Sequence, residues 1–146
     1  MEVRFTKHQL VELAAPRPLT PHELQVLERL VLGSEVALCQ VAHATVTEEC
    51  ADHCGSVVFA VPRDACGEIP RGNGLLANAE WRRGNEISDV QDVLLFVEDG
   101  LLSLLETYRG DGQVPAGLPQ PADLTMLIGP DGPAPWSDAP SRSADV

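Results

Sequence analysis

Apolar residues recur at helical spacing in one N-terminal stretch, and this spacing predicts the first regular element. Thr20 is followed by Pro21, and Glu23 stands three positions after the threonine. This order is typical of a helix start in which a capping box closes the first turn. One apolar face follows, made of Leu24, Leu27, Leu30 and Val31. Because glycine is a frequent helix stop, we predict a helix between Thr20 and Gly33.

The pattern after Gly33 favours strands. Residues 36–46 include several β-branched side chains and no glycine or proline, and residues 56–61 form a second apolar run that Pro62 ends. Residues 75–82 alternate with a period of two, which is typical of a half-buried strand. We therefore predict three strands here, the first two separated by a polar loop.

The two ends of the chain give weaker patterns. Before Thr20, the sequence allows an edge strand at residues 3–5 or a short helix within residues 6–14. Near the C-terminus, residues 122–128 are expected to close the domain as a helix or a strand. Residues 129–146 lack apolar periodicity, so we predict a single domain over residues 1–128 and a disordered tail over residues 129–146.

A β-hairpin is the strongest predicted feature. Asp99-Gly100 suits a two-residue turn and is flanked by apolar runs at residues 93–98 and 101–109. Tight closure pairs Glu98 with Leu101, Val97 with Leu102, Leu95 with Leu104, and Val93 with Glu106. This register gives the hairpin two apolar faces, one with Val93, Leu95, Val97, Leu102 and Leu104 and the other with Leu94, Phe96, Leu101 and Leu105.

Two apolar faces must both be covered. The predicted helix covers part of one face, and a second subunit is the expected cover for the rest. We therefore predict a homodimer with Phe96 or Leu105 near the interface or beneath an inter-subunit cleft. The alternative is that residues 3–13 fold over that face and keep the chain monomeric. In either case the expected fold class is α+β, with an N-terminal helix packed on an antiparallel sheet that ends in the tight hairpin.

Charge restricts the partners. The chain has 146 residues, with 10 Lys+Arg against 22 Asp+Glu and a formal net charge of −12. Such a field repels nucleic acid and anionic membrane surfaces, and it attracts a basic peptide, a basic protein or a cationic small molecule. The alternative is that the charge serves only solubility. With no signal-peptide core and no apolar stretch long enough to span a bilayer, the cytoplasm is the expected location. There, the four cysteines are expected to be reduced thiols or ligands.

The cysteine-rich loop offers the candidate metal ligands. If the chain binds a metal, its ligands are expected to be Cys50, His53, Cys54 and Cys66, which are donors that zinc accepts. The cysteines lack the two-residue spacing of common zinc motifs, so buried structural cysteines are favoured and neither a metal nor a cofactor is expected.

A polar group near the end of the hairpin is the candidate pocket. Glu106 and Tyr108 project from one face of the last strand. Trp81 stands on a neighbouring strand, and Glu80 and Arg82 beside it point to the other face. A carboxylate, a phenol and an indole suit an amine-bearing ligand. We therefore take Trp81, Glu80 and Arg82 as candidate ligand-binding residues, and Glu106, His22 and Tyr108 as candidate proton-transfer groups.

Two segments carry a resemblance to a known group of proteins. The stretch VLLFVEDGLLSLLETYRGDGQVPAGLPQPADL, together with CADHCGSVVFAV and the LTP helix start, resembles small uncharacterised actinobacterial α+β domains. These domains end in a V-x-DG-x-L-x-x-LE-x-Y hairpin and carry a cysteine- and glycine-rich loop. The resemblance spans roughly residues 19–124 and implies the α+β fold, without an activity.

Two functions fit these observations. The first is an acidic binding module for a basic peptide, a basic protein or an amine-bearing small molecule. The alternative is a small stand-alone tailoring enzyme of a natural-product pathway that acts on a ribosomal peptide without a cofactor, as in lysine cross-linking of lanthipeptides. Frequent catalytic motifs, such as G-x-S-x-G and the P-loop, are absent from the sequence.

Overall fold

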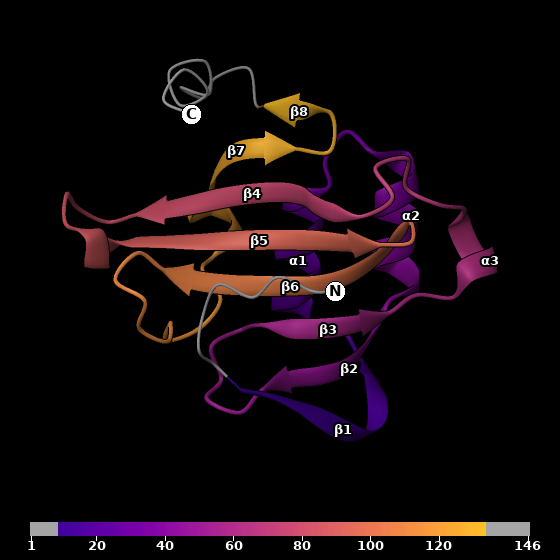
Figure 1. The fold of residues 1–146 in the computed structure, drawn as a ribbon, viewed down its shortest axis with the longest axis horizontal. Helices are drawn as coiled ribbons and strands as arrows, with labels where there is room; N and C mark the ends of the chain where they lie inside the picture. Colours follow the sequence, from indigo (N-terminus) through magenta and orange to yellow (C-terminus); the bar gives the residue numbers. More distant parts are fainter. Residues whose placement is uncertain (1–8, 134–146) are drawn as a thin grey trace.

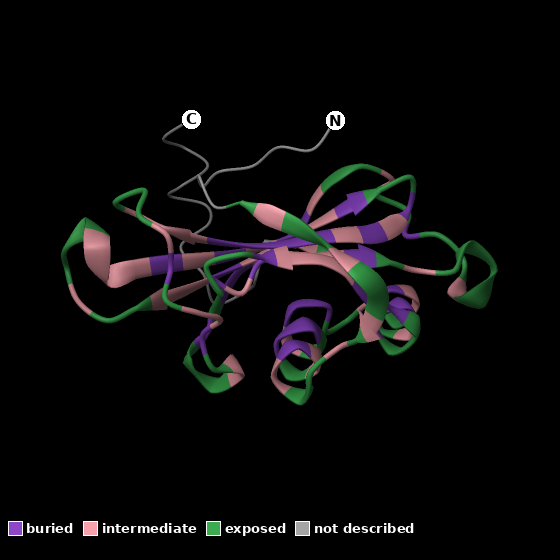
Figure 2. Cartoon of the chain, turned by 90° about the horizontal axis from the view of Figure 1, so that it is seen from below, coloured by how far each residue is buried: buried purple, intermediate pink, exposed green. Residues whose placement is uncertain are grey.

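The computed structural model describes residues 9–133, which form an antiparallel sheet with two helices on one face (Figures 1 and 2). The sheet has eight strands in the order β1-β2-β3-β6-β5-β4-β7-β8. The predicted α+β class is therefore confirmed. The elements are β1 (Leu10–Pro18), α1 (Pro21–Leu30), α2 (Glu35–His43), β2 (Thr45–Cys50), β3 (Val57–Ala60), α3 (Arg63–Cys66), β4 (Gly74–Arg82), η1 (Ile87–Asp89), β5 (Val90–Glu98), β6 (Leu101–Arg109), η2 (Pro121–Asp123), β7 (Thr125–Gly129) and β8 (Gly132–Pro133).

Helix α1 begins as the sequence predicts. The backbone N–H of Glu23 donates to Thr20 Oγ1 at 3.1 Å, and the Thr20 N–H donates to Glu23 Oε1 at 2.9 Å. These two bonds form the predicted capping box and satisfy backbone donors that the first turn leaves without helical partners. The helix buries Val26, Leu27 and Leu30 in the main hydrophobic core against the sheet.

Helix α2 corrects the prediction of a strand at residues 36–46. Ser34 caps the helix by accepting the Ala37 N–H at 3.2 Å, and the buried side chains of Ala37, Gln40 and Val41 follow helical spacing. The strand begins only at Thr45 and runs to Cys50. The prediction failed because the β-branched residues of this stretch were given more weight than the cap and the helical spacing.

The hairpin has the predicted turn and a different register beyond it. Glu98 pairs with Leu101 and Val97 with Leu102, as predicted, but Phe96 then pairs with Leu104. Ser103 is therefore the extra residue of a β-bulge, and every later position of β6 is shifted by one.

The bulge exchanges the side chains on the two faces. Leu105 pairs with Leu95 and lies in the main core, whereas Glu106 pairs with Leu94 on the opposite face. The predicted faces of Leu104 and Leu105 are thus wrong: Leu105 lies on the core side of the hairpin and Leu104 on the opposite side. Leu105 is fully buried within the chain on the helix side, while Phe96 stays on the face turned away from the helices.

The described ends of the chain extend the sheet at both edges. Leu10–Pro18 is strand β1, so a helix within residues 6–14 is wrong where the structure describes that range, and residues 3–5 lie outside it. Residues 122–128 contain the end of η2 and most of β7. Gly132 in β8 pairs with Gly129, so the predicted tail begins inside the sheet, and residues 134–146 lie outside the described range.

Candidate functional site

The sheet face turned away from α1 and α2, called the outer face here, gathers most of the predicted site residues. Cross-strand partners fix which side chains share this face. Glu12 pairs with Glu48, Glu48 with Val58, Val58 with Leu104, and Leu104 with Phe96. A second row runs from Glu80 through Asp92 to Tyr108. Partners in a β-ladder point to the same side, so these two rows form one surface.

Like charges stand directly opposite one another on the outer face. Glu12 lies opposite Glu48 near one edge of the sheet, and Glu80 lies opposite Asp92 farther along it. Directly opposed like charges destabilise a sheet by up to about 1 kcal/mol per pair. The salt bridge described on this face joins Arg82 Nε to Glu80 Oε1 at 3.3 Å. The outer face therefore carries opposed carboxylates at two positions, and Arg82 offsets part of the charge at the second.

Between the two acidic pairs lies an apolar strip. Val58, Leu94 and Phe96 are partly buried there, and Leu104 is fully buried. Glu106 is also fully buried on this face, where it is the cross-strand neighbour of Leu94. The outer face thus combines an apolar centre with carboxylates on both sides.

The structure divides the other predicted site residues between the two sides of the sheet. Glu80, Arg82, Glu106 and Tyr108 lie on the outer face, but Trp81 lies on the helix side opposite Gln91, with the Arg83 guanidinium 4.7 Å from its ring centre. His22 is on α1, where Nε2 lies 2.9 Å from the Pro119 carbonyl oxygen. The three proposed proton-transfer groups are therefore not brought together, because α1 and Glu106 are on opposite faces.

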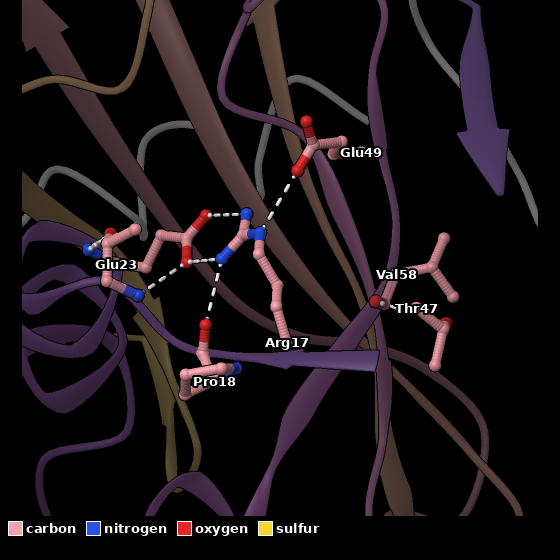
Figure 3. A network of polar contacts seen from close by, with 7 residues as sticks. Arg17, Pro18, Glu23, Thr47, Glu49 and Val58 are labelled. Atoms are coloured by element: carbon pink, nitrogen blue, oxygen red, sulfur yellow. Dashed lines mark hydrogen bonds and ion pairs between the residues drawn. The ribbon is translucent and has the colours of Figure 1, made fainter. Parts of the chain in front are cut away.

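An ionic network on the helix side joins β1, α1 and β2 (Figure 3). The Arg17 guanidinium donates to both carboxylate oxygens of Glu23 at 2.9 Å, and its Nε donates to Glu49 Oε1 at 3.0 Å. A bidentate pair of this kind fixes the orientation of the guanidinium relative to the carboxylate. Arg17 also donates to the Pro18 carbonyl at 3.0 Å. The network borders a pocket of about 190 Å³ that Cys50, His53 and Ser56 also line.

The titration of this network follows from its contacts. Burial raises the pKa of Glu23, but the hydrogen bonds and charge of Arg17, with the hydrogen bond from the Thr20 N–H, outweigh it and leave that pKa lowered. The hydrogen bond to Glu23 in turn raises the pKa of Arg17, although burial opposes it. The ion pair is thus held in its charged form, and both partners use their hydrogen-bonding capacity within the chain. The network positions β1 and α1.

The cysteines divide into two pairs, and the pair Cys39 and Cys66 differs from the expectation of reduced thiols or ligands. Cys39 and Cys66 form a disulfide between α2 and α3, with Cα atoms 5.8 Å apart. Cys50 and Cys54 are buried free thiols. Burial, and then a hydrogen bond with the Cys54 thiol, raise the pKa of Cys50, which makes it a weak nucleophile at neutral pH.

The alternative metal set Cys50, His53, Cys54 and Cys66 is therefore split by the fold. Cys66 is bonded to Cys39, and His53 is exposed at the loop surface. Within residues 9–133, the only group of three or more His, Cys, Asp and Glu donors compact enough for a metal is Cys39, His43 and Cys66. Sequence reasoning missed this group because its C-x-x-x-H spacing is meaningful only on a helix, and the segment was assigned to a strand.

Comparisons with known proteins give no match, either to a family model, to a curated protein or to a solved structure. Among the described residues, no helix has the length and apolar character needed to cross a membrane. Inference about function therefore depends on the geometry of the chain itself.

Proposed function

We propose that the protein is an acidic binding module that recognises a basic peptide, or a basic extended segment of a protein, on the outer face of its sheet. The observation that carries this proposal is the pair of directly opposed carboxylates at each side of the apolar strip, Glu12 with Glu48 and Glu80 with Asp92. At Glu12 and Glu48 the opposed charges lower stability in the free protein, and a cationic ligand placed between them converts that repulsion into attraction. At the second pair the ligand would add to the cation that Arg82 already provides for Glu80.

The separation of the two acidic pairs favours a peptide over a small amine. Their centres are four strand spacings apart in the sheet order, about 19 Å at about 4.8 Å per spacing, and four residues apart along β5, about 13 Å, which gives about 23 Å in all. An extended chain rises about 3.3 Å per residue, so a segment of about seven residues reaches from one pair to the other. The strip of Val58, Leu94 and Phe96 between them suits apolar residues placed between the cationic ones.

A defined peptide pair tests the proposal. We expect an octapeptide with lysine at positions 1 and 7, valine at positions 3 and 5 and serine elsewhere to bind in isothermal titration calorimetry, because its lysine and valine side chains share one face of the extended chain. Its affinity should fall as salt rises from about 0.05 to 0.5 M because added ions screen exposed charges. The matched peptide with glutamate in place of lysine should not bind. Mass spectrometry of the recovered peptide should show no change, since the proposed role involves no chemistry.

Matched variants locate the surface. Glu12→Gln/Glu48→Gln should weaken the lysine peptide at least tenfold. Glu28→Gln/Glu35→Gln makes the same change in net charge at exposed helix positions and should leave the affinity within about twofold, because these side chains lie on α1 and α2. Equal losses in both variants would mean that net charge alone attracts the peptide. Absence of binding to the lysine peptide, or an altered peptide mass, would overturn the proposal.

A further inference from the structure

Three soft donor atoms meet at the junction of α2 and α3. His43 lies one helical turn after Cys39, so their side chains share a face of α2. Cys66, the last residue of α3, reaches the same point. His43 Nδ1 is 3.9 Å from Cys39 Sγ and 3.5 Å from Cys66 Sγ. All three donor atoms lie within 4.8 Å of one another.

These distances are close to those of a zinc tetrahedron. With Zn–S bonds of about 2.3 Å and Zn–N bonds of about 2.0 Å, tetrahedral geometry places sulfur about 3.5 Å from nitrogen and the two sulfurs about 3.8 Å apart. The two observed sulfur–nitrogen distances, 3.5 and 3.9 Å, already approach this value. The covalent bond between the two sulfurs holds them closer together than a tetrahedral site requires.

The surroundings allow the two sulfurs to separate. Helix α3 has four residues, none of them buried, and it is followed by Gly67 with a positive φ of 84°. Cys66 can therefore move away from Cys39 without disturbing the core. His43 is exposed, and its Nδ1 lies 3.0 Å from the Cys39 carbonyl oxygen, a hydrogen bond that zinc ligation through Nδ1 would replace.

We propose that reduction of the Cys39–Cys66 disulfide creates a zinc site formed by Cys39, His43 and Cys66, with water at the fourth position. A thiol or dithiol reductant supplies two electrons and two protons, which cleave the sulfur–sulfur bond and give two thiols. Zinc binding then releases both protons, and each thiolate forms one bond to the ion. Two thiolates and an imidazole are a donor set that selects zinc over harder cations such as magnesium or calcium.

The zinc form keeps the connection that the disulfide makes. Arg63 on α3 donates to Glu68 at 2.8 Å and to the carbonyl of Asp99 in the hairpin turn at 3.3 Å. Either cross-link, covalent or metal, therefore ties α2 to the segment that contacts this turn. The chain thus has a covalent cross-link under oxidising conditions and a metal cross-link under reducing ones.

Cobalt titration of the full chain tests the inference. After treatment with a phosphine reductant, we expect one equivalent of Co²⁺ to give tetrahedral d–d bands and a thiolate charge-transfer band, and one equivalent of Zn²⁺ to abolish both. Oxidised protein, which is lighter by two hydrogens in mass spectrometry, should give neither band. Elemental analysis of the reduced protein after gel filtration should find one zinc per chain.

Three variants assign the ligands. Cys39→Ser/Cys66→Ser should lose the charge-transfer band and the bound zinc, and His43→Gln should lower zinc affinity at least tenfold. Cys50→Ser/Cys54→Ser, the matched control, should bind as the wild type does, and circular dichroism should show that all three variants are folded. Absence of metal in the reduced wild type would overturn the proposal. So would retention in the Cys39/Cys66 variant, which would place the metal at the buried pair.

Discussion

Replacing Gln40 by leucine should destabilise the protein by about 2–4 kcal/mol, although no charge is lost. Gln40 is fully buried on α2 and makes three hydrogen bonds to backbone groups. Its Nε2 donates to the carbonyls of Gly67 at 2.8 Å and Gly100 at 3.0 Å, and its Oε1 accepts the Leu102 N–H at 2.9 Å. One side chain therefore ties the helix to the hairpin turn and to the segment after α3.

The magnitude follows from what each group does after the substitution. The buried Leu102 N–H is left without its acceptor, which costs about 1–3 kcal/mol. The Gly100 carbonyl keeps the Ile69 N–H at 2.8 Å, so its loss is limited to about 1 kcal/mol for one net hydrogen bond. Gly67 is exposed, and water replaces the lost donor at its carbonyl. Leucine is close to glutamine in size, so no cavity adds to the sum.

Urea denaturation followed by circular dichroism measures the effect. With a slope of about 2 kcal/mol/M for a domain of this size, the midpoint should fall by about 1–2 M while the slope is unchanged. Gln25→Leu, at an exposed position of α1, is the control and should shift the midpoint by less than about 0.3 M. A loss below about 1 kcal/mol in Gln40→Leu would refute the argument that these three bonds are needed.

Three further predictions concern charge and assembly. The lowered pKa of Glu23 means that its ion pair stabilises the fold fully above the ordinary value of 4.5 and loses this contribution as pH falls through the lowered folded value. The difference in unfolding free energy between wild type and Glu23→Gln should thus shrink between pH 6 and pH 3, and a difference independent of pH would contradict this. Glu12→Gln/Glu48→Gln should raise stability by up to about 1 kcal/mol in urea, since it relieves opposed charges; a decrease would show that these carboxylates are paired favourably in the free protein. The homodimer stays a prediction, and a dimer through the strip that carries Phe96 would compete with the peptide for the outer face. Light scattering at micromolar concentration should give about twice the 15.7 kDa chain mass, and a value near one chain would exclude the dimer.

The helix start and the hairpin turn could be predicted from the sequence, because each depends on residues only a few positions apart. The Thr20–Glu23 capping box and the Asp99-Gly100 turn each determine their geometry within a few residues, and both are present as expected. Helix α2 was missed because Ser34, a good N-cap, was outweighed by the valines that follow it. Tertiary packing stabilises the helix here, because the side chains of Ala37, Gln40 and Val41 all point inward at helical spacing.

The candidate site was harder to predict than the fold, because it depends on which face each side chain takes. Glu106 and Tyr108 share the outer face, and so does Glu80, which was expected to point away from the face of Trp81. Trp81 and His22 were added on chemical grounds and lie on the helix side. The Cys39–Cys66 disulfide joins residues 27 positions apart, and no local signal reveals such a pairing before the helix and the following loop are placed.

The bulge at Ser103 shows how energetics, more than turn geometry, select the register of the hairpin. Continuing the two-residue turn without a bulge would direct Glu106 into the helix-side core and Leu105 toward the outer face. A leucine fills the core position in either register, because without the bulge Leu104 would replace Leu105 there. The next inward position differs: Thr107 carries no charge and donates to the Cys54 carbonyl at 2.8 Å, whereas the Glu106 carboxylate would face that carbonyl oxygen without a donor. The same shift moves Glu106 to the face that carries Glu48 and Asp92, so the packing of the core also sets the charge of the outer face.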